Sequence, residues 1–216
     1  MDYVEASIFP DSSYEINRHI VCGISLGGHA TWQSLFREER VRAAISVIGC
    51  PNYVHLMHDR AKISENPEWR DKDWFGSTQF PNGLIEAVRK HDPVGMITRD
   101  LCKPAEISTF FNKSQHPETN KIMRARLTEA LQGKTFLNMS GADDQLVPYR
   151  TSQGFVEWLS STLATPESTI NFKFQNKIYE GVGHAISPNM AKDIDQFVVG
   201  FLSDLKQGTD HLVPKM

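Results

Sequence analysis

The sequence predicts an α/β domain in which a mostly parallel sheet has helices on both faces. The run at residues 43–48 is short, continuous and apolar, as in a strand covered on both sides, and residues 19–24 and 134–140 predict further strands. Segments with helical spacing of apolar residues alternate with these strands. A strand, a helix and a second strand fit within residues 19–49, which predicts a right-handed βαβ unit.

The composition indicates a single globular domain. The chain has 216 residues, of which 40% are hydrophobic, enough for one substantial core. Its formal net charge of −3 and scattered basic residues give no indication of a nucleic-acid or membrane partner. No apolar stretch reaches the ~18 residues that a membrane span needs, and no secretory signal is visible. We therefore expect a cytoplasmic protein.

The first part of the chain holds the predicted βαβ unit. Residues 2–15 predict the end of a helix followed by a loop around Pro10. A strand at 19–24 leads into a helix over about 27–37, whose apolar face includes Trp32 and Phe36. The next strand spans about 42–49.

A long irregular segment, residues 51–133, separates this unit from the next predicted strand. Prolines recur through it, and helical patterns occur at 84–90 and 121–131. It is too long for an ordinary connection, so we expect a helical cap or lid inserted into the domain. Trp69, Trp74 and Phe75 line either the interior of this cap or a substrate pocket.

Regular structure returns after residue 133. A strand at 134–140 is followed by a polar loop at 141–148 and a helix over about 151–163. Residues 170–175 alternate apolar and polar side chains, which predicts a strand near a sheet edge with one wet face. After a glycine-rich loop, a closing helix is expected to begin at Pro188, with Ser187 as its N-cap.

The pattern Gly-x-Ser-x-Gly at residues 23–27 lies between a predicted strand and a predicted helix. A serine on such a sharp turn is typical of a nucleophile elbow. We expect Gly23 and Gly27 to lack room for a Cβ, and Gly28 to let the helix pack closely against neighbouring strands.

Candidate partners for Ser25 lie in two later loops. A serine hydroxyl needs a base to take its proton, and a carboxylate to orient that base. Asp143 and Asp144 follow one predicted strand, and His184 follows another. Because the carboxyl ends of parallel strands meet at one edge of a sheet, these loops are expected to converge.

Three segments together resemble the α/β-hydrolase superfamily: residues 23–28 (Gly-Ile-Ser-Leu-Gly-Gly), 141–148 (Gly-Ala-Asp-Asp-Gln-Leu-Val-Pro) and 179–184 (Tyr-Glu-Gly-Val-Gly-His). The branch that they most resemble holds the dienelactone-hydrolase and prolyl-oligopeptidase-like enzymes. The resemblance covers residues 17–50 and 134–205.

This resemblance implies a serine hydrolase that acts on a small-molecule acyl substrate: an ester, a thioester or, as a further class, a peptide bond. The order serine, acid, histidine and the loop pattern Gly-x-x-Asp-x-x-Val-Pro imply a triad of Ser25, Asp144 and His184, with Asp144 preferred over Asp143. It implies neither a cofactor nor a metal.

The chain departs from the superfamily before the nucleophile. Four strands usually precede the elbow, together with a loop that donates the second oxyanion hydrogen bond, sometimes through a His-Gly-Gly motif that this sequence lacks. Only the Leu26 N–H is assigned as an oxyanion donor. We therefore expect residues 1–216 to form one N-terminally truncated hydrolase domain, and the exposed elbow strand to favour self-association. The alternative is a catalytically weak or inactive interaction module.

Several other residues have competing interpretations. His29 is expected to pack structurally rather than to contact substrate. His55, His58 and Asp59 resemble a metal site but are expected to form an exposed helical turn, because no further ligands are near. The three cysteines predict structural thiols in a reducing compartment. The C-terminal Pro-Lys-Met loosely resembles a peroxisomal signal, which makes the peroxisome an alternative location.

Overall fold

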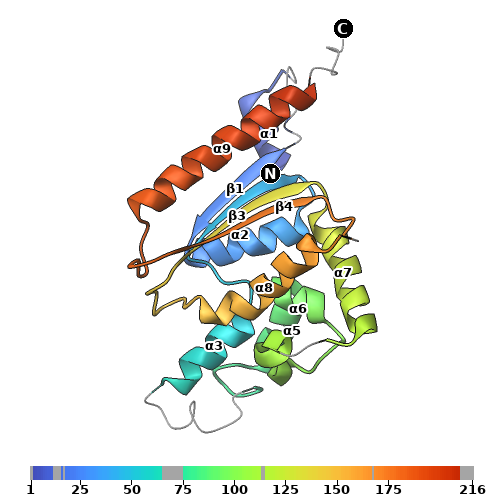
Figure 1. The fold of residues 1–216 in the computed structure, drawn as a ribbon, viewed down its shortest axis with the longest axis vertical. Coiled ribbons are helices and arrows are strands. Elements are labelled where there is room, and N and C mark those ends of the chain that lie inside the picture. The colour runs from blue at the N-terminus through green and yellow to red at the C-terminus, as the bar shows by residue number, and fades with distance from the viewer. Residues whose placement is uncertain are drawn as a thin grey trace.

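A four-stranded, entirely parallel sheet forms the centre of the computed structural model, in the order β1-β2-β3-β4 (Figure 1). The structure describes residues 2–11, 16, 18–64, 75–112, 115–166 and 168–209. The strands are β1 (His19–Ile24), β2 (Val41–Val47), β3 (Lys134–Gly141) and β4 (Phe172–Tyr179). The predicted parallel α/β sheet is confirmed.

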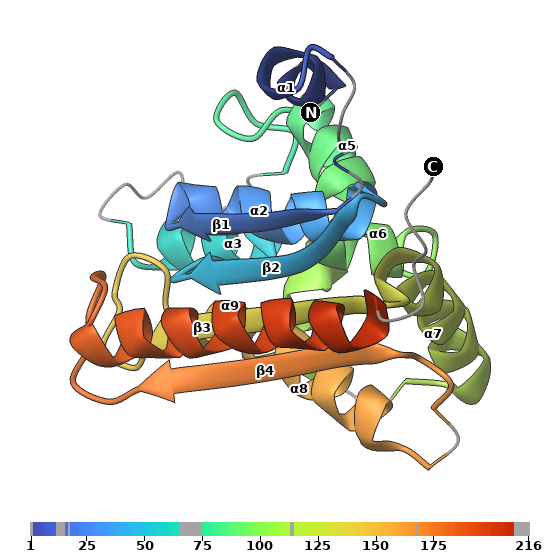
Figure 2. The same ribbon diagram turned by 90° about the horizontal axis from the view of Figure 1, so that it is seen from above.

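Helices cover both faces of this sheet. The helices are α1 (Asp2–Ile8), α2 (Leu26–Arg37), α3 (Tyr53–Lys62), α5 (Asn82–His91), α6 (Pro93–Thr98), the 3-10 helix η1 (Pro104–Asn112), α7 (Pro117–Leu131), α8 (Arg150–Ala164) and α9 (Pro188–Thr209). Figure 2 shows α9 along one face, α2 and α8 on the other, and β1 and β4 at opposite edges. No helix in the described part of the chain is long and apolar enough to cross a membrane.

The two central strands, β2 and β3, are buried on both sides, as the apolar run at residues 43–48 predicted for β2. On one face, β2 and β3 pack through Ala43, Ile45 and Leu137 against Met190 and Phe197 of α9 and their neighbours. The opposite face contributes to a larger core that also contains side chains from α2, α7 and α8. Burial of both faces explains why these strands do not alternate polar and apolar residues.

Trp32 of α2 occupies the middle of the larger core. It is fully buried and meets Phe136 of β3 edge-on, with ring centroids 4.4 Å apart. Its indole N–H donates to Asn138 Oδ1 at 3.2 Å, and the Asn138 amide donates in turn to Asn176 Oδ1 on β4 at 2.8 Å. The buried Asn138 is therefore satisfied, and it ties α2 and β4 to β3.

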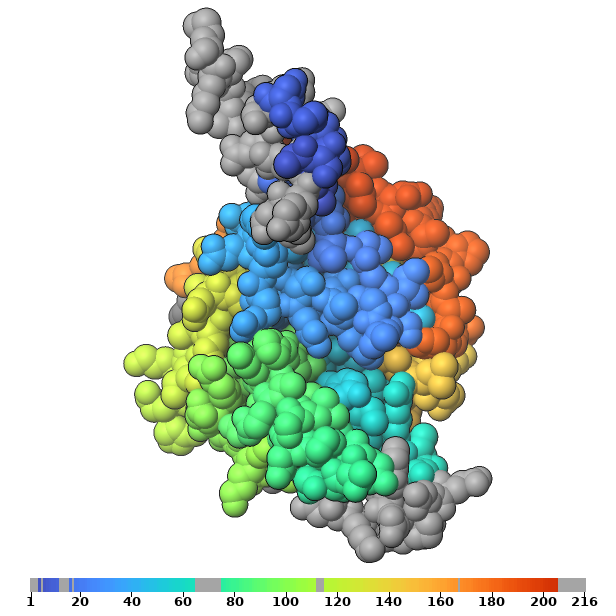
Figure 3. Space-filling view, turned by 180° about the vertical axis from the view of Figure 1, so that it is seen from behind, coloured from blue at the N-terminus to red at the C-terminus, as the bar shows by residue number. Residues whose placement is uncertain are grey.

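The helices between residues 53 and 131 pack into the same core as α2. Buried side chains from α3, α5, α6 and α7 belong to the cluster that contains Trp32. Viewed from behind, the surface of α5, in green, adjoins that of α2, in blue (Figure 3). Phe75 packs edge-on against Phe80, with centroids 5.6 Å apart, whereas Trp69 and Trp74 lie outside the described residues. The role of 51–133 as a cap stays a prediction.

The last strand differs in extent from its prediction. The alternation at 170–175 predicted its start, but β4 begins at Phe172 and continues to Tyr179. It lies at a sheet edge and exposes alternate side chains, as expected. The closing helix begins at Pro188, with the Ser187 hydroxyl accepting from the Met190 N–H at 3.2 Å, which confirms the predicted cap.

Candidate active site

Ser25 lies on a strained turn between β1 and α2. Its φ of 55° and ψ of −114° are unfavourable for a residue with a side chain. The turn is secured on the strand side, where the Ser25 N–H donates to the Val47 carbonyl at 2.9 Å. The local geometry therefore lifts the serine side chain away from the sheet, at the point where the helix begins.

The glycines around Ser25 differ in whether there is room for a side chain at their position. A Cβ on Gly23 would overlap the Gly27 carbonyl, and one on Gly28 would lie 2.9 Å from the Gly49 Cα, so both positions exclude a side chain. The expectation for Gly27 is wrong, because a Cβ there would meet nothing within 4 Å. The close approach involves the Gly27 carbonyl rather than its α-carbon.

Ser25, His184 and Asp144 form a continuous chain of hydrogen bonds. Ser25 Oγ lies 2.8 Å from His184 Nε2, and His184 Nδ1 lies 2.8 Å from Asp144 Oδ2. Since a carboxylate can only accept, Nδ1 carries the proton and Nε2 is left to accept from the serine. This tautomer is the one in which the imidazole can act as a base toward Ser25.

The structure distinguishes the two neighbouring aspartates. Asp144 is 2% exposed, and its Oδ1 accepts from the backbone N–H groups of Leu146 and Val147, each at 2.9 Å. Its other oxygen is thereby directed at His184. Asp143 is exposed, and its backbone N–H instead donates to the Val182 carbonyl at 3.0 Å. Asp143 therefore joins the acid loop to the histidine loop without meeting the imidazole.

The loops meet because of close backbone packing at the carboxyl end of the sheet. The Ala142 N–H donates to the Tyr179 carbonyl at 2.9 Å, and a Cβ on Gly141 would overlap the Val182 carbonyl. The loop after β3 thus lies directly on the loop after β4. Neither contact can be read from the local sequence, since the partners are far apart along the chain.

Unpaired amides surround Ser25 at the start of α2. The first helical bond after the turn runs from the His29 N–H to the Ser25 carbonyl, at 3.0 Å. The N–H groups of Leu26 and the two residues after it therefore have no acceptor within the helix. An exposed helix N-terminus with free N–H groups favours negative charge at this position.

His29 packs beside the site as a neutral side chain. Its Nδ1 accepts from the Cys50 N–H at 2.6 Å, which joins α2 to the end of β2. Burial, with a smaller contribution from the nearby Arg60, lowers its pKa to about 4. A neutral, hydrogen-bonded imidazole agrees with the structural role expected for it.

Two contacts from α3, one to the acid loop and one to the start of α8, were not predicted from the sequence. Arg60 of α3 donates to the Leu146 carbonyl at 2.6 Å, and Asp59 forms a two-point ion pair with Arg150, at 3.0 and 2.8 Å. The predicted turn of His55, His58 and Asp59 is partly buried rather than exposed. No group of His, Cys, Asp and Glu in the described part of the chain could hold a metal ion.

The thiols are free, as their spacing predicted, but differ in environment. Cys50 is buried, and this burial raises its pKa to about 11. Cys22 is exposed on β1 and Cys102 is half-buried. A thiol with a raised pKa is a poor nucleophile, so Cys50 does not compete with Ser25 as a reactive group.

No protein-family model and no curated protein matches the chain. Solved structures do. An acylaminoacyl peptidase in complex with Z-Gly-Gly-Phe-chloromethyl ketone matches with a TM-score of 0.52 and 18% identity, over 93% of this chain and 26% of that chain. A puromycin hydrolase matches with a TM-score of 0.46 and 15% identity, over 85% and 21%. Esterase PE8 matches with a TM-score of 0.44 and 14% identity, over 92% and 57%.

The likeness to the acylaminoacyl peptidase, together with the parallel sheet, shows a partial α/β-hydrolase fold. At this level of identity the likeness extends to the fold alone. The chain spans about a fifth of the puromycin hydrolase and 57% of the esterase that it matches.

Proposed function

We propose that this chain is a serine hydrolase of carboxylic esters or thioesters, with peptide bonds as a further class of substrate. The observation that supports this most directly is the hydrogen-bond chain from Ser25 Oγ through His184 to Asp144, with both distances at 2.8 Å. Such an arrangement activates a hydroxyl that would otherwise be a poor nucleophile.

In the proposed reaction, Ser25 Oγ attacks the acyl carbon while His184 Nε2 takes its proton. Asp144 holds the imidazole in the required tautomer and stabilises its positive charge. The tetrahedral oxyanion accepts a hydrogen bond from the Leu26 N–H at the start of α2. His184 then returns the proton to the leaving group, and water releases the acyl group from Ser25 by the same steps in reverse roles.

The test is labelling with a fluorophosphonate probe, which reacts covalently with an activated serine. We expect labelling of the wild-type chain and none of Ser25→Ala. Ser161→Ala is the matched control, because Ser161 is exposed on α8 and only bonds its own helix. Circular dichroism of each sample verifies that it is folded. A folded wild-type protein that is not labelled would refute the proposal.

That negative result would favour the second candidate, an interaction module that retains the three residues without turnover. The open edge of β1 is the observation that supports it, since among the described residues β1 pairs only with β2. The His19 and Ser25 N–H groups both face β2, so those of Ile20, Cys22 and Ile24 face the open edge.

We also propose that β1 associates with a second copy of this chain. Its side chains carry no acidic or lysine charge, and Ile20 and Ile24 are 38% and 48% exposed. The opposite edge of the sheet, β4, carries charged side chains. Lys173 and Lys177 of β4 form ion pairs with Asp204 and Asp193 of α9, at 2.6 and 2.7 Å. A charged edge discourages pairing between sheets.

Sedimentation measurements compare the two edges. Ile20→Lys is expected to shift the protein toward monomer, whereas Ile178→Lys, at a similarly exposed position on β4, leaves association unchanged. A wild-type chain that stays monomeric at high concentration would refute self-association.

The proposed compartment is the cytoplasm, which the three free thiols support. The C-terminal residues 210–216, including Pro-Lys-Met, lie outside the described residues. A fluorescent protein fused ahead of this tail and found in peroxisomes would refute the cytoplasmic assignment.

A further inference from the structure

A cavity of about 550 Å³ lies at the amino end of the sheet. It is bounded by the end of α2, the start of β2 and β3, and parts of α5, α6 and α7. Ser25 lies at the opposite end, and β3 alone, with its 8 residues, separates the two ends by about 26 Å. The cavity is therefore distinct from the proposed active site. Its size is typical of small-molecule sites.

Positive charge dominates this cavity, although the whole chain is acidic, with a net charge of −3. Six cationic side chains line it against two carboxylates. The cations are Arg37, Arg42, Lys90, Arg99, Arg126 and Lys134, and the carboxylates are Glu39 and Glu129. A cavity lined by one sign of charge concentrates ligands of the opposite sign.

Two of the cations are already used by the fold. Lys134 Nζ donates to the Leu35 and Glu38 carbonyls at 2.5 and 3.1 Å, at the end of α2. Arg126 Nη1 donates to the Ile97 and Arg99 carbonyls at 2.9 and 2.5 Å. These contacts hold the walls of the cavity together, and they leave Nε and Nη2 of Arg126 available.

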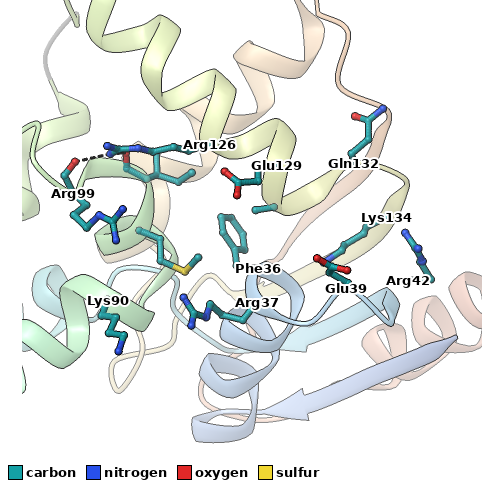
Figure 4. A pocket seen from close by; sticks show the side chains of 13 residues that line it. Phe36, Arg37, Glu39, Arg42, Lys90, Arg99, Arg126, Glu129, Gln132 and Lys134 are labelled. Atoms are coloured by element: carbon teal, nitrogen blue, oxygen red, sulfur yellow. Dashed lines mark hydrogen bonds between the residues drawn. The ribbon is translucent and has the colours of Figure 1, made fainter. Parts of the chain in front are cut away.

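Three other cations are free to meet a ligand. Arg37 and Lys90 have no hydrogen bond or ion pair within the described residues, and Arg99 has only an exposed contact of 3.5 Å to Asp100. They come from α2, α5 and the turn after α6. Figure 4 shows all three on one side of Phe36, with Arg42 and Lys134 on the other.

We propose that this pocket binds a small molecule carrying two or more phosphate groups. Arginine matches the geometry of phosphate oxygens, and Arg37, Lys90 and Arg99 approach from separate elements rather than from one point. A chain of phosphates offers several oxygens, so it can accept hydrogen bonds from all three side chains at once. Met96 is half-buried beside the buried Phe36 and Ile97, and it offers an apolar contact for an attached organic group.

Isothermal titration calorimetry of the full chain tests this site with inorganic triphosphate, ATP and adenosine as probes. We expect saturable one-to-one binding of triphosphate, of ATP, or of both, and no binding of adenosine. Arg37→Gln and Lys90→Gln are each expected to weaken binding about 10-fold, because each removes a charge-assisted hydrogen bond. Arg42→Gln, beyond Phe36, is expected to have a smaller effect.

Lys121→Gln is the matched control, since Lys121 is exposed on α7 outside the cavity and should leave binding unchanged. Tighter binding of ATP than of triphosphate would indicate that the ligand carries an organic group. Tighter binding of triphosphate would indicate an inorganic ligand. Both results support the site. Failure of the folded protein to bind either probe would refute it. An equal loss of binding affinity in Lys121→Gln and Arg37→Gln would also refute it. Binding of a single-stranded oligonucleotide by a protein that binds neither probe would refute it as well.

Discussion

The two ends of the parallel sheet use polar side chains in different ways. At the carboxyl end, Ser25, His184 and Asp144 are linked in series, so each side chain depends on the next. At the amino end, the cationic side chains act separately: Lys134 and Arg126 each donate hydrogen bonds to backbone carbonyls. The first arrangement is suited to moving a proton, and the second to holding helices and attracting anions.

This difference predicts that substitutions at the two ends affect different measurements. Changes to Ser25, His184 or Asp144 at the carboxyl end should reduce reaction with the probe and preserve stability. Changes at the amino end should alter stability or anion binding and preserve the reaction. The following predictions run from the largest expected effect to the smallest.

Asp144→Asn is expected to slow fluorophosphonate labelling about 10⁴-fold, because an amide facing Nδ1 favours the wrong tautomer of His184. The asparagine carbonyl can still accept from the Leu146 and Val147 N–H groups, so the fold should be retained. Asp143→Asn, one residue away and exposed, is the control and should label within a few-fold of wild type. Equal rates for the two variants would show that Asp144 does not orient the base.

Lys134→Met is expected to lower the free energy of unfolding by about 2 kcal/mol, since it leaves the Leu35 and Glu38 carbonyls without their charged donor. Burial lowers the pKa of Lys134, so the folded state binds fewer protons than the unfolded state. Wild-type stability from this group therefore rises with pH, from the lowered pKa up to the unfolded value near 10.5.

Urea unfolding at neutral and alkaline pH measures both effects. Lys134→Met should lack the rise in stability with pH, and its fluorophosphonate labelling rate should equal that of the wild type. A large loss of labelling in folded Lys134→Met would mean that the two ends are coupled.

Asp92→Asn is expected to give the smallest change in the free energy of unfolding. The stability contributed by Asp92 depends on pH in the opposite direction to that contributed by Lys134. Asp92 is buried near the carboxyl end, where its Oδ1 accepts from the Tyr53 N–H at 3.3 Å and its Oδ2 forms no hydrogen bond with the described residues. Burial raises its pKa well above 3.8, so the folded state retains a proton that the unfolded state releases. Stability is therefore lost as pH rises from about 3.8 toward the raised value.

Replacing this carboxyl by an amide should remove that loss, leaving the variant more stable than wild type at pH 8. At pH 4 the two should be similar. Unfolding curves at both pH values provide the measurement, and parallel pH profiles for the two proteins would contradict the assignment.

Local sequence was sufficient for most elements. Strand β1 was predicted at its observed bounds, and the Pro188 helix start followed from its cap. These features depend on residues adjacent in the chain: an apolar run before a glycine turn, or a serine before a proline. The bounds of β4 were less accurate, because its second half is defined by pairing with β3 rather than by its own alternation.

The candidate site could be predicted only in part. Ser25 and His184 were predicted from their motifs, and Asp144 was preferred over Asp143 from the resemblance alone. The structure gives a physical reason for that preference: the Leu146 and Val147 amides bind Oδ1 of Asp144 and thereby direct its Oδ2 at His184. The error at Gly27 arose because a motif indicates that a turn is tight without showing which atoms are close.

By itself, the sequence determined the strand and helix pattern and the order of the candidate residues, since these depend on short-range periodicity and turn chemistry. Only the tertiary structure decided which atoms meet. The Ser25–His184 hydrogen bond joins residues 159 positions apart, and the Arg60 contact to the acid loop joins residues 86 positions apart. The cationic cavity likewise gathers side chains from separate elements, because the packing of helices against a shared core, rather than any local pattern, brings them together.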